Sequence, residues 1–221
     1  MGKIVFATNN AHKMKEVAAK LSNEYQLVTL RECGITEKVP ENEPTIEGNA
    51  LQKARYVHER TGADGFADDT GLEVDALGGA PGVHSARYAT DGHDFEANMR
   101  LLLRNMEGKS DRRARFRTVI ALTLDAEEYV FEGVVEGRIT EQPAGDHGFG
   151  YDPVFVPEGE TETFAEMAPE RKNAISHRGR AVRRFAGFMR LSDARPEQEP
   201  PRACHQAARP VGTGGCGFPC W

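Results

Sequence analysis

Apolar positions recur along the chain with two different periods, and the changes of period mark the expected elements. Residues 3–8 form a short apolar run that predicts a strand, and residues 9–21 place apolar side chains at helical spacing. A second amphipathic helix is expected at 47–60, and residues 64–69 bring the chain back as a strand. The first third of the chain is therefore predicted to alternate between strand and helix.

The pattern of residues 94–191 predicts a third helix, a hairpin and a last helix. Residues 94–108 carry an apolar stripe at helical spacing, with Asp94 as the expected N-cap. Two runs rich in β-branched residues lie within 115–139 around a short acidic turn, which predicts a β-hairpin. Residues 176–191 predict a basic helix. The side chains expected to pack it onto the core are Ala181, Phe185 and Phe188. We expect a mixed α/β fold with a long central hairpin.

Composition divides the chain at one place. The 221 residues are 39% hydrophobic, enough for one substantial core, and we expect a single domain over residues 1–191. Residues 192–221 contain five prolines and four glycines without helical or strand period, which predicts a disordered tail. Three of the four cysteines lie in this tail. Their spacing, with His205 included, matches neither a disulfide framework nor a common zinc finger.

Charge and hydropathy exclude several classes of partner. The formal net charge of −6 argues against a broad surface for duplex nucleic acid, although a local basic pocket could still bind a small anion. No window approaches the roughly 18 consecutive apolar residues of a membrane span, and the N-terminus has no hydrophobic segment long enough for a signal peptide. We therefore expect a cytoplasmic protein with neither a nucleic-acid nor a membrane partner.

Two adjacent carboxylates, Asp68 and Asp69, follow the apolar step at 64–67. Neighbouring side chains in a strand point to opposite faces, and because aspartate is a poor strand former we expect the pair at a strand end. Like charges this close repel unless a cation or hydrogen-bond donors compensate them, which suggests a metal site or an acid/base pair. A solvated turn is the alternative, since Asp, Thr and Gly all favour turns.

The loop at residues 7–13 leaves a predicted strand and enters a predicted helix. Its backbone N–H groups, with Lys13 beside them, suit a phosphate, although the Walker A pattern is absent. A plain helix cap by Thr8 or Asn9 is the alternative interpretation of this loop.

Two segments near the C-terminal end of the domain also combine residues suited to a nucleotide. Residues 148–155 mix glycines that allow close backbone approach with aromatic rings that could stack on a base, or they form an aromatic turn on the core. Residues 171–181 gather Lys172, His177 and Arg178 around Ser176, the expected N-cap, or they form a solvated basic helix face. Together with the carboxylates, these segments describe a nucleotide site.

Five segments in order make the chain similar to the inosine triphosphate pyrophosphatase family, whose members remove deaminated purine nucleotides. They are FATNNAHKMKEV, FADDTGLEVDALGGAPGVHSARYA, ARFRTVIAL, GFGYDPVF and KNAISHRGRA. The resemblance implies a two-lobed α/β fold around a long curved mixed sheet flanked by helices, with the substrate in a cleft between the lobes, usually in a homodimer. It implies Mg²⁺-dependent hydrolysis of ITP, dITP and XTP to the monophosphate and pyrophosphate.

The resemblance also implies roles for individual residues. Asp69 would be the general base and a metal ligand, and Glu41 the second metal carboxylate, in a segment that departs from the family's usual Glu-Thr-Gly wording. Asp68 would reinforce the local negative charge or bind a second ion, and Arg87 would be structural rather than catalytic. The residues expected to bind the triphosphate and base are Thr8, Asn9, Asn10, Ala11, His12, Lys13, Lys53, Thr70, Phe149, Gly150, Tyr151, Asp152, Lys172, His177 and Arg178.

Three other functions are alternatives to nucleotide hydrolysis by this family's reaction. A nucleotide-binding module without turnover would have little use for three acidic residues at the site. A single-stranded nucleic-acid binder would need a basic groove with interleaved aromatics, whereas residues 1–191 are acidic. A nucleoside triphosphate pyrophosphatase with a different base specificity is the nearest alternative and differs only in its substrate.

Overall fold

The structure is a computed structural model that describes residues 2–21 and 25–193. Within these residues, seven strands form one mixed sheet in the order β2-β1-β3-β5-β6-β7, with β4 paired to β3. The strands are β1 (Gly2–Phe6), β2 (Tyr25–Thr29), β3 (Gly65–Val74), β4 (Pro81–Gly82), β5 (Arg113–Leu124), β6 (Glu127–Ile139) and β7 (Phe155–Pro157). The helices are α1 (Ala11–Leu21), α2 (Ile46–Thr61), α3 (Phe95–Asn105), α4 (Pro169–Ile175) and α5 (His177–Asp193). This α/β architecture confirms the predicted fold class.

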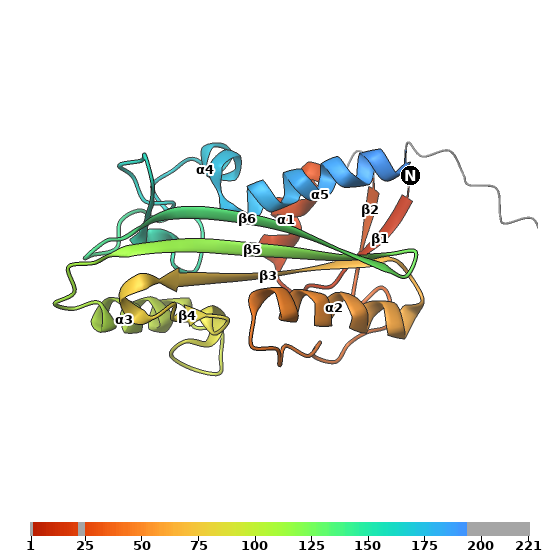
Figure 1. The fold of residues 1–221 in the computed structure, drawn as a ribbon, viewed down its shortest axis with the longest axis horizontal. Coiled ribbons are helices and arrows are strands. Elements are labelled where there is room, and N and C mark those ends of the chain that lie inside the picture. The colour runs from red at the N-terminus through yellow and green to blue at the C-terminus, as the bar shows by residue number, and fades with distance from the viewer. Residues whose placement is uncertain (1, 22–24, 194–221) are drawn as a thin grey trace, which may run out of the picture.

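Helices cover both faces of the long sheet. In Figure 1, α1, α4 and α5 lie on one face, and α2 and α3 lie on the other. The alternation of side chains along β5 serves both layers: Ile120 and Leu122 pack toward α1 and α5, whereas Val119 and Ala121 pack toward α2. A third hydrophobic cluster fills the opposite end of the sheet, around Phe155 and α3. The core is thus divided into two lobes along the sheet.

The predicted hairpin is confirmed as β5 and β6. The register pairs Leu124 with Glu127, so the loop has only two residues. These residues, Asp125 and Ala126, have φ angles of 52° and 65°, a left-handed geometry that matches the twist of the flanking strands. The hairpin is the longest ladder of the sheet and joins the two lobes.

A gap beside β3 opens the sheet between the lobes. β1 pairs with β3 only through Val5–Gly65 and Phe6–Phe66, and β4 pairs with β3 only at Leu72 and Glu73. Residues 67–71 of β3 therefore have β5 as their strand partner on one side and no strand on the other among the described residues. This stretch contains Asp68 and Asp69, which lie in the middle of β3. The prediction of a strand end was wrong; the pair lies instead just beyond the end of β1.

Close packing against β6 sets the position of α5. A Cβ atom at Gly133 would lie 2.0 Å from the carbonyl oxygen of His177, so only glycine lets the start of α5 come this close to the sheet. Farther along the helix, Arg180 and Arg184 donate to the carbonyl oxygens of Val134 (2.8 Å) and Glu132 (2.6 Å). These carbonyls lie on the edge of β6 that faces away from β5.

The helices expected at 9–21, 47–60, 94–108 and 176–191 are confirmed, and Asp94 caps α3 by accepting from the backbone N–H of Ala97. β2, β4, β7 and α4 had not been predicted. The disordered tail predicted at 192–221 lies almost wholly outside the described residues, although α5 continues to Asp193. In the described part of the chain, the helices are too short or too polar to span a bilayer.

Candidate active site

A cleft of about 710 Å³ lies at the gap beside β3 and reaches both faces of the sheet. It collects nearly every residue that the sequence had proposed for the site. The lining includes Thr8, Asn9, Asn10, Lys13, Glu41, Lys53, Asp68, Asp69, Thr70, Phe149, Gly150, Tyr151, Asp152, Lys172, His177 and Arg178. The side chains of Ala11 and His12, which were also proposed, lie outside the described part of the structure.

The loop before α1 brings backbone donors to the cleft. Asn10 caps the helix, because its side-chain oxygen accepts from the N–H of Lys13 (3.2 Å), while the hydroxyl of Thr8 accepts from the N–H of Asn10 (3.2 Å). The predicted cap by Thr8 or Asn9 was therefore wrong by one or two residues. The positive end of the α1 dipole and the Lys13 ammonium lie at this end of the cleft, which suits an anion.

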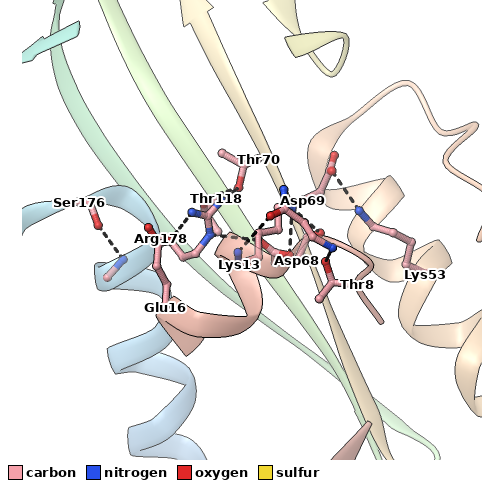
Figure 2. Close-up of polar contacts among 12 residues, drawn as sticks. Thr8, Lys13, Glu16, Lys53, Asp68, Asp69, Thr70, Thr118, Ser176 and Arg178 are labelled. Carbon is pink, nitrogen blue, oxygen red and sulfur yellow. Dashed lines mark hydrogen bonds and ion pairs between the residues drawn. The ribbon is translucent and has the colours of Figure 1, made fainter. Parts of the chain in front are cut away.

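Asp68 lies on the α1 and α5 face of β3 and is almost completely buried. Its two carboxylate oxygens pair with Lys13 Nζ (3.0 Å) and Arg178 Nε (3.3 Å), as Figure 2 shows. Burial opposes ionisation of this carboxyl, but the attraction of Lys13, Arg178 and Lys53 outweighs it and holds the pKa of Asp68 below its usual value. Asp68 is thus a fixed negative charge between two cations.

Asp69 points to the opposite face, toward α2. Its Oδ1 lies 3.1 Å from Lys53 Nζ, and the same ammonium lies 2.8 Å from Glu41 Oε1. Burial raises the pKa of Asp69, against the opposing attraction of Lys53 and Lys13. The pKa of Lys53 is also raised, because two carboxylates near this ammonium outweigh the cost of its burial. Glu41 and Asp69 share one ammonium, so the negative charge of Asp69 is compensated less than that of Asp68.

The pair of Glu41 and Asp69 is the part of the cleft suited to a divalent cation. One oxygen of each carboxylate lies within 3.1 Å of a single cationic atom, Lys53 Nζ, so both converge on one position that can hold positive charge. Among the described residues, no cluster of three or more His, Cys, Asp or Glu side chains converges on such a position. Mg²⁺ is usually held by one or two carboxylates together with substrate phosphates and water, so this donor set fits it.

Three hydrogen bonds fasten the turn that carries Arg87 to other parts of the chain. Ser85 accepts from the N–H of Leu72 in β3 (2.8 Å), Asn98 of α3 accepts from the N–H of Ala89 (2.7 Å), and Tyr151 donates to the carbonyl of Ser85 (2.8 Å). The guanidinium of Arg87 lies 3.3 Å from Glu41 Oε2. Arg87 therefore belongs to the lining of the cleft, beside the carboxylate pair.

Aromatic rings and cations meet at the other end of the cleft. Lys172 and Arg178 lie over the ring of Phe149, with their charged atoms 5.2 and 5.5 Å from its centroid. Asp152 accepts from the N–H of Phe149 (2.7 Å) and from Lys172 Nζ (2.8 Å). Gly148, with φ of 78°, allows this turn, because a Cβ there would lie 2.2 Å from Asp152 Oδ2. The turn holds a flat, electron-rich surface in place.

His177 begins α5 in the same region. Ser176 caps the helix as predicted, since its hydroxyl accepts from the N–H of Gly179 (3.1 Å). The imidazole stacks on Phe116 with centroids 4.5 Å apart, and burial together with the nearby cations lowers its pKa well below the usual value. Nδ1 is buried and lacks a hydrogen-bond partner among the described residues. His177 is therefore a neutral ring that can still donate or accept a hydrogen bond.

Sequence reasoning missed Glu16, whose carboxylate joins α1 to Arg178 and Lys172. Glu16 pairs with Arg178 Nη1 (2.5 Å) and lies 3.8 Å from Lys172 Nζ. It follows Lys13 by three positions in α1, so helical periodicity alone places both on one face. That spacing was the available signal. Glu16 lies behind the cleft rather than in its lining. The lining residues that sequence reasoning had not proposed include Lys38, Asn49, Asp91, His93, Phe95 and Phe116.

Comparisons with known proteins cover almost the whole described chain. The sequence pattern of the Ham1 family matches residues 4–188. The dITP/XTP pyrophosphatase of Porphyromonas gingivalis is 52% identical over 190 residues, covering 86% of this chain and 98% of the relative. The Ham1 protein of Staphylococcus aureus superposes with a TM-score of 0.80 at 37% identity, covering 86% of this chain and 99% of that one. A nucleoside-triphosphatase / dITP/XTP pyrophosphatase of Mycobacterium abscessus gives a TM-score of 0.71 at 44% identity, covering 83% and 98%.

Proposed function

The chain belongs to the Ham1 family, and from this membership we propose that it hydrolyses noncanonical purine nucleoside triphosphates (ITP, dITP and XTP) to the monophosphate and pyrophosphate. The observation that carries the proposal is the arrangement of charge in the cleft. On one face of β3, Lys13 at the start of α1 and Arg178 flank Asp68, and the ring of Phe149 lies beside Arg178. On the opposite face, Asp69 lies with Glu41 and Lys53. These parts suit a triphosphate, a base and the bond to be broken.

Asp69 is the residue we assign to the attack of water on the α-phosphorus. Hydrolysis needs a base that orients the water and accepts its proton, and a carboxyl with a raised pKa is a stronger base than an ordinary aspartate. Lys53 holds the carboxylate in place through the 3.1 Å contact with Oδ1. Lys13 and Arg178 supply positive charge near the triphosphate, where negative charge develops as the bond breaks.

Glu41 and Asp69 would hold Mg²⁺, as their convergence on one cation position supports. When bound, the ion would offset negative charge on the phosphates and the leaving pyrophosphate. Arg87 keeps Glu41 oriented toward this position through its contact with Oε2.

Base selection is assigned to the end of the cleft around Phe149. The ring presents a face on which a purine can stack, and Lys172, His177 and Arg178 provide donors for a 6-keto oxygen. Adenine carries an amino group at that position and would leave these buried donors unpaired. A site built for one hydrogen-bonding edge can reject the other by up to about 10⁴ to 10⁵ fold.

A panel of nucleotides with pyrophosphate detection tests the function. We expect ITP, dITP and XTP to be hydrolysed far better than ATP or GTP, with one pyrophosphate released per monophosphate formed. Equal turnover of ATP and ITP would contradict the proposed specificity, and release of inorganic phosphate alone would contradict the reaction. Turnover confined to pyrimidine or methylated nucleotides would favour the pyrophosphatase of different specificity.

Two further expectations, one from the family resemblance and one from the hydropathy of the sequence, are also proposals. We propose that the protein is a homodimer, which light scattering after size-exclusion chromatography would test. We also propose that it acts in the cytoplasm, where it would remove noncanonical nucleotides from the precursor pool, and cell fractionation would test this location.

A further inference from the structure

A fully buried threonine on β5 contacts the active site without lining it. Thr118 is the cross-strand partner of Thr70 on β3, and the two hydroxyl oxygens lie 2.7 Å apart (Figure 2). The side chain of Thr118 is 0% exposed, whereas Thr70 lines the cleft. The residues that follow Thr118 in β5 are Val119, Ile120, Ala121 and Leu122. A hydroxyl at the start of this apolar run calls for a reason.

The direction of the hydrogen bond follows from the third member of the group. Arg178 Nη2 lies 3.2 Å from the hydroxyl of Thr70, and a guanidinium can only donate, so Thr70 accepts this bond. The Thr70 hydroxyl then has one acceptor position and its own proton left. Between Thr70 and Thr118, either residue could supply the proton.

Burial decides between the two directions. If Thr70 donated to Thr118, the proton of Thr118 would need another acceptor in a fully buried site, and the described residues give Thr118 no hydrogen bond except the one to Thr70. A buried donor without a partner costs more than a typical hydrogen bond contributes. If Thr118 donates to Thr70, the hydroxyl proton of Thr118 is satisfied, and only that of Thr70 is left without an acceptor, at a side chain that lines the cleft.

We propose that Thr118 is a positioning residue: it donates its proton to Thr70 and thereby directs the hydroxyl proton of Thr70 into the cleft, toward a phosphate oxygen of the substrate. Thr70 accepts from both Arg178 and Thr118, and these two donors polarise its hydroxyl and fix its orientation. The inference rests on the proposed nucleotide hydrolysis. Thr118 belongs to the segment ARFRTVIAL, and the proposed mechanism had given no role to any residue of this segment.

A second buried threonine on the same strand supplies a matched control. Thr123 is 4% exposed, and its hydroxyl has no hydrogen-bond partner among the described residues. It lies opposite Gly65, at the end of β5 away from Thr70. Thr123→Val makes the same chemical change as Thr118→Val in the same strand, without touching the group at the cleft.

The test is a double-mutant cycle on kcat/KM for ITP with the full-length protein. We expect Thr118→Val to lower kcat/KM about threefold to tenfold, the factor expected for one hydrogen bond of ordinary strength. Thr118→Ser, which keeps the hydroxyl, should restore it to within about twofold of the parent, and Thr123→Val should leave it unchanged. In a Thr70→Val background, Thr118→Val should cause no further loss, because Thr118 acts only through Thr70.

Three outcomes would overturn the assignment. In the first, Thr118→Val lowers kcat/KM equally in the parent and in the Thr70→Val background; in the second, Thr118→Ser lowers it as much as Thr118→Val does; in the third, Thr118→Val leaves it unchanged. If Thr118→Val does not fold, Thr118→Ala takes its place in the same cycle. These outcomes are distinct from a failure of the proposed function, because that failure would appear as absence of ITP hydrolysis in the parent protein.

Discussion

Asp68 and Asp69 are neighbours in sequence, yet the two faces of β3 give them opposite surroundings. On the α1 and α5 face, Asp68 pairs with two cations, Lys13 and Arg178, and its pKa lies below the usual value. On the α2 face, Asp69 shares the single ammonium of Lys53 with Glu41, and its pKa lies above the usual value. Asp68 is a charge held between two cations, and Asp69 is the carboxylate that we propose as the base.

This difference follows from the alternation of a strand. Because consecutive side chains point to opposite faces, a single Asp-Asp step delivers one carboxylate to each of two helical layers. The gap beyond the end of β1 then lets one cleft reach both of them. Two carboxylates with different environments can take different roles, which is how acids and bases are commonly separated in enzyme sites.

The largest effect is expected for Asp69→Asn. The change keeps the shape of the side chain but removes its basicity and its charge, and the loss of a general base should lower turnover by about 10² to 10⁴ fold. Loss of a ligand for Mg²⁺ would add to this. Turnover of ITP at saturating Mg²⁺ measures the effect, alongside a melting curve.

The fold should tolerate Asp69→Asn, because Lys53 keeps Glu41 as a partner. Glu73→Gln is a suitable control, since Glu73 lies on the same strand with an ion pair to Arg115 and outside the lining of the cleft. Its turnover should stay within about twofold of the parent, on the order of the noise in such comparisons. If Asp69→Asn is stable and nearly as active as the parent, Asp69 is not the base.

Asp68→Asn should instead show its main effect on stability. It removes the carboxylate that Lys13 shares with the buried Arg178, and breaking a buried ion pair in this way costs about 3 to 5 kcal/mol. Urea unfolding measures the change in the free energy of unfolding. Glu73→Gln breaks a half-exposed ion pair with Arg115 and should change this free energy by less than about 1 kcal/mol. An Asp68→Asn variant as stable as Asp69→Asn would remove the distinction between the two faces.

The smallest expected effect is a difference in pH dependence of opposite sign. A carboxyl with a lowered folded pKa contributes stability above its unfolded pKa and loses it as the pH falls through the folded pKa. A carboxyl with a raised folded pKa gains stability as the pH falls from the folded pKa toward the unfolded one. As the pH falls below the usual pKa of aspartate, the free energy of unfolding of the parent should therefore approach that of Asp68→Asn. Just above that pKa, the free energy of unfolding of the parent should rise relative to that of Asp69→Asn as the pH falls.

Urea unfolding of the parent and both variants at a series of acidic pH values measures these differences. For a single group, the slope cannot exceed about 1.4 kcal/mol per pH unit. Slopes of the same sign for the two variants would contradict the opposite pKa directions of Asp68 and Asp69.

The sequence predicted the parts of this fold that depend on local periodicity. The long helices follow from hydrophobic spacing, and the β5–β6 hairpin follows from two runs rich in β-branched residues around a short acidic turn; both predictions were confirmed. Residues from all five family-like segments line the one cleft, and these segments lie on strands β3 and β5 as well as on loops and helix starts. Short elements such as β4 and β7, with two and three residues, carry too little periodicity to be recognised.

Tertiary contacts account for what sequence reasoning missed. The Asp pair was placed at a strand end because aspartate disfavours strands, but Lys13, Arg178 and Lys53 compensate the charges in the middle of β3. Thr118 looked like an ordinary β-branched strand residue, and only its register opposite Thr70 reveals its contact with the site. Pairing between strands 48 positions apart leaves no local trace in the sequence.

The arginines of α5 have a consequence for the behaviour of the protein at high concentration. Beyond its short pairing with β7, β6 presents an outer edge, and an uncovered strand edge is a template on which another chain can add a strand and begin aggregation. Arg180 and Arg184 occupy the carbonyls of Val134 and Glu132 and place positive charge along that edge. The helix whose first turn lines the cleft thus also covers this edge of the sheet, and the close contact at Gly133 sets its position for both.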